Sequence, residues 1–207
     1  MSEEPTVFVI DDDDSVRKSL SRLLRSMGFE VETFASAEQY LEREPYRGIG
    51  CIVLDLRMPG LSGTDLQDRL SKAEDSLPII FITGHGTVPT SVKALKAGAE
   101  DFLEKPFQDN ELLDAVSQAI EKYRHLRKEQ NELNGLRARL DSLTPREREV
   151  FGLVVSGMLN KQVAYQLGTA EKTIKVHRAR VMQKMGAKSL ADLVRFAEKL
   201  GIRFSAV

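Results

Sequence analysis

The chain has little that would support a disulfide-bonded, secreted or membrane-spanning protein. It contains one cysteine, Cys51, among 207 residues, so no disulfide can form within the chain, and Cys-x-x-Cys and Cys/His zinc patterns are absent. No apolar run approaches the ~20 residues that a membrane helix needs. The opening MSEEPTVFVI is acidic and lacks the basic start of a secretory signal. These features favour a cytoplasmic protein with no membrane segment.

Charge is divided unevenly along the chain. The net charge is only -1, yet residues 1–124 carry 23 acidic and 14 basic side chains, whereas residues 125–207 carry 8 acidic and 16 basic ones. The length suits one large domain or two small ones. An acidic half joined to a basic half indicates two domains with different partners, and the basic half suits a polyanion.

The first half alternates short apolar runs with amphipathic segments. The apolar runs are residues 6–10, 31–34, 51–56, 79–83 and 101–105. The helix-like segments between and after them are residues 14–27, 36–44, 62–73, 88–98 and 109–124. This alternation predicts an α/β domain over residues 1–124, with a doubly wound, five-stranded and mostly parallel sheet.

Residues 125–143 are rich in leucine and predict a helical linker. Leu126, Leu133 and Leu140 recur every seven residues, although Gly135 interrupts the pattern. Two interpretations stay open. The segment could form a short coiled coil with a second copy, or its leucines could rest on the domains of its own chain.

Residues 144–207 show no strand-like alternation and predict a small all-α domain of four helices. A short helix, NKQVAYQL, precedes a longer basic one, AEKTIKVHRARVMQKMG, and SLADLVRFAEKLG is the last. We expect N-caps at Thr144, Thr169 and Ser189, because hydroxyl side chains accept hydrogen bonds from the first turn of a helix. Gly168 is expected to end the short helix.

Four predicted strands end in, or are directly followed by, residues whose side chains can bind a metal or take part in a reaction. Asp11 and Asp12 follow the first strand, Asp55 ends the third, Thr83 ends the fourth and Lys105 ends the fifth. The functional residues of a doubly wound sheet gather at the carboxyl ends of its strands. We therefore expect three carboxylates, a hydroxyl and an ammonium to converge although they are far apart in sequence.

This set of groups suits phosphoryl transfer. Carboxylate oxygens are the ligands that Mg²⁺ prefers, and a carboxylate beside the metal can act as a nucleophile and form an acyl phosphate. An ammonium and a hydroxyl can bind phosphate oxygens. Asp55, which is followed by the loop RMPGLSG, is the natural nucleophile.

Each of these residues also has an ordinary structural explanation. One carboxylate at a strand end is more often a helix cap than a ligand, and Asp13 and Asp14 are interpreted as capping or solvated residues. Thr83 could merely end its strand, and Lys105 could be a surface lysine. The combination at four strand ends favours the site. His85 is interpreted as a loop residue.

The first half resembles the receiver domain of two-component response regulators. The resemblance rests on the acidic pair after the first strand, on LDLRMPGLSG around Asp55, on FITGHG around Thr83 and on FLEKPF around Lys105. It implies a flavodoxin-like fold in which Asp55 accepts a phosphoryl group from a sensor histidine kinase. It also implies that the domain catalyses only its own phosphorylation and dephosphorylation.

The resemblance further implies the ligands of a Mg²⁺ ion. Asp12, Asp55 and the backbone carbonyl of Arg57 would bind the metal, with Asp11 acting mainly through water. These ligands would explain why a chain keeps two acidic residues together at the end of a buried strand.

The resemblance also implies a conformational switch. Thr83 would turn toward the phosphate, and Lys105 would pair with it, with a cis peptide bond between Lys105 and Pro106. The aromatic residue that responds to the threonine is often tyrosine in relatives and is Phe102 here. Phe102 can change rotamer but cannot form hydroxyl contacts.

The second half contains a candidate recognition helix. A short helix, a tight turn and a longer basic helix are what a helix-turn-helix needs to enter the major groove of double-stranded DNA. On charge alone, a solvated basic face is the alternative. LTPREREV and NKQVAYQLGTAEKTIKVHRARVMQKMGAKS closely resemble the LuxR-type DNA-binding domain. Joined to the receiver, this domain is similar to the FixJ group of the NarL class.

The second resemblance implies which residues contact DNA. Bases would be faced by Lys175, Val176 and Ala179. Phosphates would be contacted by Lys161, Lys172 and Thr173.

Together the two resemblances imply a transcription factor, more often an activator. Phosphorylation would favour a homodimer that binds paired half-sites, and RNA polymerase is a further candidate partner. Two alternatives stay open. One is a DNA-binding regulator that works without phosphorylation. The other is a haloacid-dehalogenase-like phosphatase, suggested by Asp11-x-Asp13-x-Ser15, although such enzymes need a further acidic pair that this basic, helical second half does not supply.

Overall fold

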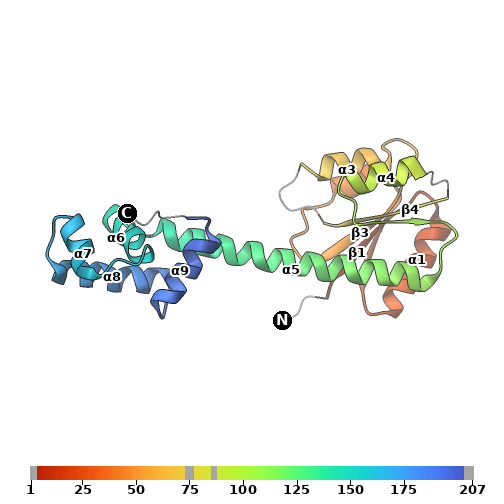
Figure 1. Ribbon diagram of the computed structural model, residues 1–207. Helices are drawn as coiled ribbons and strands as arrows, with labels where there is room; N and C mark the ends of the chain where they lie inside the picture. The colour runs from red at the N-terminus through yellow and green to blue at the C-terminus, as the bar shows by residue number, and fades with distance from the viewer. Residues whose placement is uncertain (1–3, 73–76, 85–87, 203–207) are drawn as a thin grey trace. The chain divides into compact units, whose positions relative to one another are not determined.

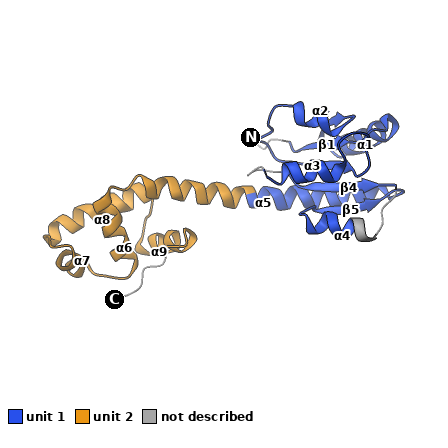
Figure 2. Ribbon diagram, turned by 90° about the horizontal axis from the view of Figure 1, so that it is seen from above, with its two compact units in different colours: residues 1–126 blue, residues 127–207 orange. Residues whose placement is uncertain are grey.

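The computed structural model describes residues 4–72, 77–84 and 88–202. It divides into two compact units, Met1–Leu126 and Arg127–Val207, which Figure 2 shows in blue and orange. Unit 2 includes most of the segment that we predicted as a separate linker. No helix in the described ranges is long and apolar enough to cross a membrane.

Unit 1 is built on the predicted parallel sheet. Its strands are β1 (Thr6–Ile10), β2 (Glu30–Phe34), β3 (Gly50–Asp55), β4 (Ile79–Thr83) and β5 (Asp101–Glu104). They pair in the order β2-β1-β3-β4-β5, and every pairing is parallel. The order changes direction between β1 and β3, and the crevice at such a switch point is where doubly wound folds place their sites.

Helices cover both faces of this sheet. They are α1 (Asp14–Ser26), α2 (Ala37–Glu42), α3 (Gly63–Leu70), α4 (Val88–Lys96) and the first part of α5 (Asp109–Asp141). Figure 1 shows α3 and α4 on one side of the sheet and α1 and α5 on the other. Neighbouring strand residues alternate between the two cores, since Val7 packs with Leu24 and Leu112, whereas Phe8 packs with Leu66.

The α5 helix runs through the predicted boundary between domain and linker. It is one helix of 33 residues, where we expected a helix over 109–124 followed by a linker over 125–143. Leu143 is buried in the core of unit 2 and Leu140 packs against it, while Leu136 is buried and Leu126 is 53% exposed. Part of the leucine repeat therefore serves the core of unit 2, and pairing with a second copy stays a prediction.

Unit 2 contains four further helices, as expected. They are α6 (Pro145–Val155), α7 (Asn160–Gln166), α8 (Glu171–Met185) and α9 (Leu190–Lys199). Thr144 and Ser189 are N-caps with complete capping boxes. The prediction for Thr169 was wrong, since Ala170 is the N-cap of α8 and makes no side-chain cap. The backbone N–H of Thr169 instead donates to Ala164 at the end of α7, so this residue belongs to the turn.

A buried carboxylate ties α6 to α8. Glu147 is only 2% exposed and accepts a hydrogen bond from the ammonium of Lys184 at 2.6 Å. It also accepts from the backbone N–H of Thr144. These hydrogen bonds, that of Lys184 first, lower the pKa of Glu147 from 4.5 to about 2. The ionised form of Glu147 therefore stabilises unit 2.

Replacing Lys184 with methionine should destabilise unit 2 and change its response to acid. We expect the Lys184→Met substitution to lower the free energy of unfolding of unit 2 by about 1–3 kcal/mol at neutral pH, because Glu147 stays buried without its cation. Because the pKa of Glu147 is lower in the folded state, its ionised carboxylate stabilises the fold fully at pH values above the unfolded pKa of 4.5. This stabilisation is lost as the pH falls toward the folded pKa of about 2. The difference between variant and wild type should therefore shrink over that range. Hydrogen exchange of peptides from unit 2, followed at several pH values, measures this difference in stability.

The matched control is Lys188→Met, because Lys188 is an exposed lysine close to Lys184. It should change stability by less than about 0.5 kcal/mol. Equal losses in the two variants at every pH would contradict the role given to Glu147.

Candidate functional site

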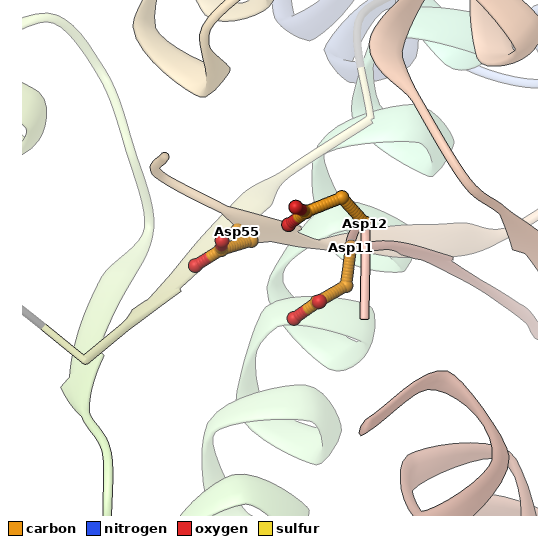
Figure 3. A group of neighbouring side chains, drawn as sticks. All are labelled: Asp11, Asp12 and Asp55. Carbon is orange, nitrogen blue, oxygen red and sulfur yellow. The ribbon is translucent and has the colours of Figure 1, made fainter. Parts of the chain in front are cut away.

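Three carboxylates meet at the switch point of the sheet. Asp11 and Asp12 directly follow β1, and Asp55 is the last residue of β3, which pairs with β1 up to Ile10 and Leu54. One carboxylate oxygen of each aspartate lies within 4.8 Å of the others (Figure 3). Asp11 and Asp55 are buried, whereas Asp12 is exposed. The site therefore combines two buried carboxylates with one that is open to solvent.

Lys105 supplies positive charge from the end of β5. Its Nζ lies 2.7 Å from Asp11 Oδ2 and 3.6 Å from Asp55 Oδ1. Its backbone N–H donates to the carbonyl of Thr83 at 2.7 Å, and the bond between Lys105 and Pro106 is cis, as the resemblance implied. The lysine thus reaches both buried carboxylates.

Burial raises the pKa of Asp55 above its ordinary value. The charge of Lys105 opposes this shift in pKa, while the charges of Asp11 and Asp12 add to it. One ammonium group faces three carboxylates here, and a bound cation would favour the ionised form of Asp55.

The donor set fits a Mg²⁺ ion. Around octahedral Mg²⁺, ligand oxygens at ~2.1 Å lie roughly 3–4 Å apart, so the separations of up to 4.8 Å need only small side-chain rotations. Both oxygens of Asp11 already have partners, since Oδ1 accepts from the N–H of Asp13 and Oδ2 from Lys105. Asp12 and Asp55 are therefore the more available direct ligands. Arg57 lies two residues beyond Asp55, at the exposed start of the following loop.

Thr83 lies next to this site in the sheet, and Phe102 lies on the neighbouring strand β5. Thr83 is the last residue of β4, is 1% exposed, and follows Ile82, the residue that pairs with Asp55. Phe102 on β5 packs against Phe81, with the ring centroids 6.5 Å apart. Phe102 is only partly buried, so its ring lies at the margin of the core. The predicted loop residue His85 lies outside the described residues.

The β1–α1 connection is held by contacts that sequence reasoning partly missed. Asp13 is the N-cap of α1 and accepts from the N–H groups of Ser15 and Val16, which confirms its capping role. Arg17 was not predicted, yet its Nη1 donates to the carbonyl of Asp11 at 2.7 Å and its Nη2 to Asp14 at 3.1 Å. An arginine one turn into a helix has many alternative partners, so the sequence carried no distinct signal for this contact.

The loop after Asp55 is also anchored by residues that were not predicted. Glu38, in the first turn of α2, accepts a hydrogen bond from the N–H of Leu61 at 2.9 Å. Gly63 begins α3 so close to Asp55 that a Cβ atom would lie 2.5 Å from the Asp55 carbonyl oxygen. No local pattern links Glu38 to Leu61, because they are 23 residues apart.

Unit 2 presents the residues that were expected to contact DNA. On α8, Ile174, Val181 and Met185 are buried in the core, which leaves another face of the helix free. Exposed positions include every predicted contact, namely Lys161 on α7 and Lys172, Thr173, Lys175, Val176 and Ala179 on α8. Gly168, with φ +63°, lies in the turn between the two helices. Two helices joined by a tight turn, with a basic second helix, match a helix-turn-helix.

Comparisons with protein families cover both units. The response regulator receiver domain family matches residues 7–117, and the luxR family of bacterial regulatory proteins matches residues 141–197. These matches favour the receiver interpretation over a haloacid-dehalogenase-like phosphatase.

Several known proteins resemble the chain over nearly its whole length. Nodulation protein W of Bradyrhizobium diazoefficiens is 51% identical over 201 residues, covering 97% of this chain and 88% of that protein. The transcriptional regulatory protein FixJ of Rhizobium meliloti is 46% identical, covering 93% of this chain and 94% of FixJ. The solved structure of the response regulator StyR has a TM-score of 0.89 at 50% identity, covering 95% of this chain and 99% of StyR. The chain therefore belongs to the FixJ-type two-component response regulators, with a receiver domain followed by a LuxR-type DNA-binding domain.

Proposed function

We propose that Asp55 accepts a phosphoryl group from a sensor histidine kinase and that phosphorylation controls binding to double-stranded DNA. The observation that carries the proposal is the convergence of Asp55 with Asp11, Asp12 and Lys105 at one edge of the sheet. The receiver family supports the kinase as the phosphoryl donor, and the luxR family supports DNA as the target. A DNA-binding regulator of this kind acts in the bacterial cytoplasm.

Each residue of the site has its own role in phosphoryl transfer. An oxygen of Asp55 attacks the phosphorus atom, and the bond between phosphorus and the histidine nitrogen breaks. Asp12, Asp55 and the backbone carbonyl of Arg57 would hold Mg²⁺, with Asp11 acting through water. When bound, this ion would neutralise charge on the carboxylates and on the phosphoryl oxygens. Lys105, whose Nζ lies 3.6 Å from Asp55 Oδ1, is near enough to pair with a phosphoryl oxygen.

Thr83 and Phe102 would report the phosphorylated state. The Thr83 hydroxyl can donate to a phosphoryl oxygen, since Thr83 ends the strand next to Asp55. Its displacement would let the Phe102 ring move, through packing alone because phenylalanine has no hydroxyl. A phosphoryl group binds only one of two conformations well, so it shifts the population toward that conformation.

The output would be a homodimer bound to paired DNA half-sites. Lys175, Val176 and Ala179 would face the bases. The phosphates would be contacted by Lys161, Lys172 and Thr173. Basic contacts to phosphate supply most of the affinity, while the base-facing residues supply sequence preference. The relative named as a transcriptional regulatory protein supports control of transcription. We propose activation as the mode of control, with RNA polymerase as a further partner.

Asp12→Asn should weaken Mg²⁺ binding by at least about tenfold, because it removes a charged oxygen ligand. Isothermal titration of the full chain with MgCl₂ measures this change. Asp13→Asn is the matched control, since asparagine also caps helices and the Asp13 side chain caps α1. The control should bind Mg²⁺ within about twofold of the wild type. Equal weakening in both variants would contradict the assignment of Asp12 as a ligand.

Phosphorylation should raise both dimerisation and DNA affinity. We expect the wild type with Mg²⁺ and a small-molecule phosphodonor to sediment as a dimer and to bind a duplex selected from a random library more tightly than without phosphodonor. Asp55→Asn should show neither change, whereas Asp68→Asn, which alters an exposed aspartate on α3, should behave like the wild type.

Equal DNA affinity for the wild type with and without phosphodonor would favour a regulator that works without phosphorylation. Phosphorylated protein that remains monomeric at micromolar concentrations would contradict the dimer step.

A further inference from the structure

The C-terminal end of the recognition helix α8 is held by a residue of α5. Gly186 ends α8 with φ +68°, and the N–H groups of Gly186 and Ala187 donate back to Gln183 and Met182. The Met185 carbonyl accepts a hydrogen bond from Arg139 Nη1 at 3.2 Å. A cation at this end also interacts favourably with the negative end of the helix dipole.

The same guanidinium of Arg139 also packs against Gly186. A Cβ atom added to Gly186 would lie 2.8 Å from Arg139 Nη1 and 3.3 Å from its Cζ. The guanidinium therefore lies directly against the backbone of Gly186. Glycine at this position satisfies two requirements at once, a positive φ and room for the arginine.

Arg139 is itself anchored, because the part of α5 that belongs to unit 2 is held along the same helical face. Leu136 is buried, and Glu132 forms an ion pair with Lys199 of α9 at 3.0 Å. Residues 132, 136 and 139 share one side of a helix, since they are four and three positions apart. The Arg139 contact thus joins the end of α8 to a helix that is already fixed within unit 2.

We propose that Arg139 is a positioning residue for DNA sequence recognition. The proposal rests on the DNA-binding role of α8 given above. Ala179 lies six residues before Met185, which is only ~9 Å along a helix, so a change in the tilt of α8 at Met185 displaces the side chains that face bases. Hydrogen bonds to base edges depend on direction, whereas phosphate contacts mainly position the protein and carry no sequence information. Loss of Arg139 should therefore reduce sequence preference more than general affinity.

The test compares Arg139→Ala with Arg137→Ala in the full-length protein. Arg137 is an exposed arginine on the same helix, so both variants lose one positive charge. The probes are a duplex selected by the wild type from a random library and a scrambled duplex of equal composition, both at one salt concentration. The ratio of the two affinities is insensitive to the fraction of protein that is folded.

We expect Arg139→Ala to lower the ratio by about 3- to 10-fold and to leave affinity for the scrambled duplex within about twofold. Arg137→Ala should leave the ratio unchanged. An unchanged ratio in Arg139→Ala would overturn the positioning role while the proposed function stands. If the wild type, treated with Mg²⁺ and a small-molecule phosphodonor, enriches no sequence from the library, the proposed DNA-binding function fails, and this inference fails with it.

A double-mutant cycle tests the contact separately from DNA. Gly186→Ala should lower the melting temperature of unit 2 less in the Arg139→Ala background than in the wild type, because the clash with the guanidinium is gone and only the cost of positive φ remains. Additive changes in melting temperature would overturn the proposed contact.

Discussion

The chemistry of unit 1 depends on negative charge that the fold holds, partly buried, at one edge of a parallel sheet. Asp55 is buried at the end of β3, beside Asp11 and Asp12, and its pKa is raised mainly by that burial. Lys105 reaches over from β5 and offsets part of the negative charge. The remaining negative charge makes the site receptive to a divalent cation, and a metal bound there would in turn favour a bound phosphoryl group. The strand order brings these groups together, because β1 and β3 are neighbours at the switch point.

The positive charge of unit 2 serves two purposes. Residues 125–207 carry 16 basic side chains, which the sequence associates with a polyanion. Several of them instead donate to backbone carbonyls at or just beyond the ends of helices. These contacts are Arg139 to Met185, Arg146 to Leu167, Arg148 to Leu140 and Lys184 to Ser142. A cation from another helix at such a position interacts favourably with the negative end of the helix dipole and links the two helices. Net charge therefore overstates the positive charge that is available for DNA.

The sequence predicted features that depend on local pattern and on the geometry of parallel sheets. The five strands, the convergence of Asp11 with Asp55, and the caps at Thr144 and Ser189 follow from such rules. The prediction failed where two local signals competed, because Thr169 can cap a helix but lies in the turn that closes α7.

Other features lay beyond local reasoning. The leucine repeat predicted helix on both sides of residue 125, but it did not predict that α5 is one uninterrupted helix from Asp109 to Asp141. The contacts of Glu38 with Leu61 and of Arg139 with Met185 join residues that are 23 and 46 positions apart. The roles of the residues expected to contact DNA stay predictions. Exposure alone does not distinguish a side chain that contacts base edges from one that is only solvated.

The central claim is that Asp55 is the phosphoacceptor of this receiver. The most direct measurement is intact mass after incubation with Mg²⁺ and a small-molecule phosphodonor, for the wild type and for Asp55→Asn. We expect a gain of one phosphoryl group in the wild type and none in the variant. An equal gain in both proteins would place the phosphoryl group elsewhere and would contradict the account.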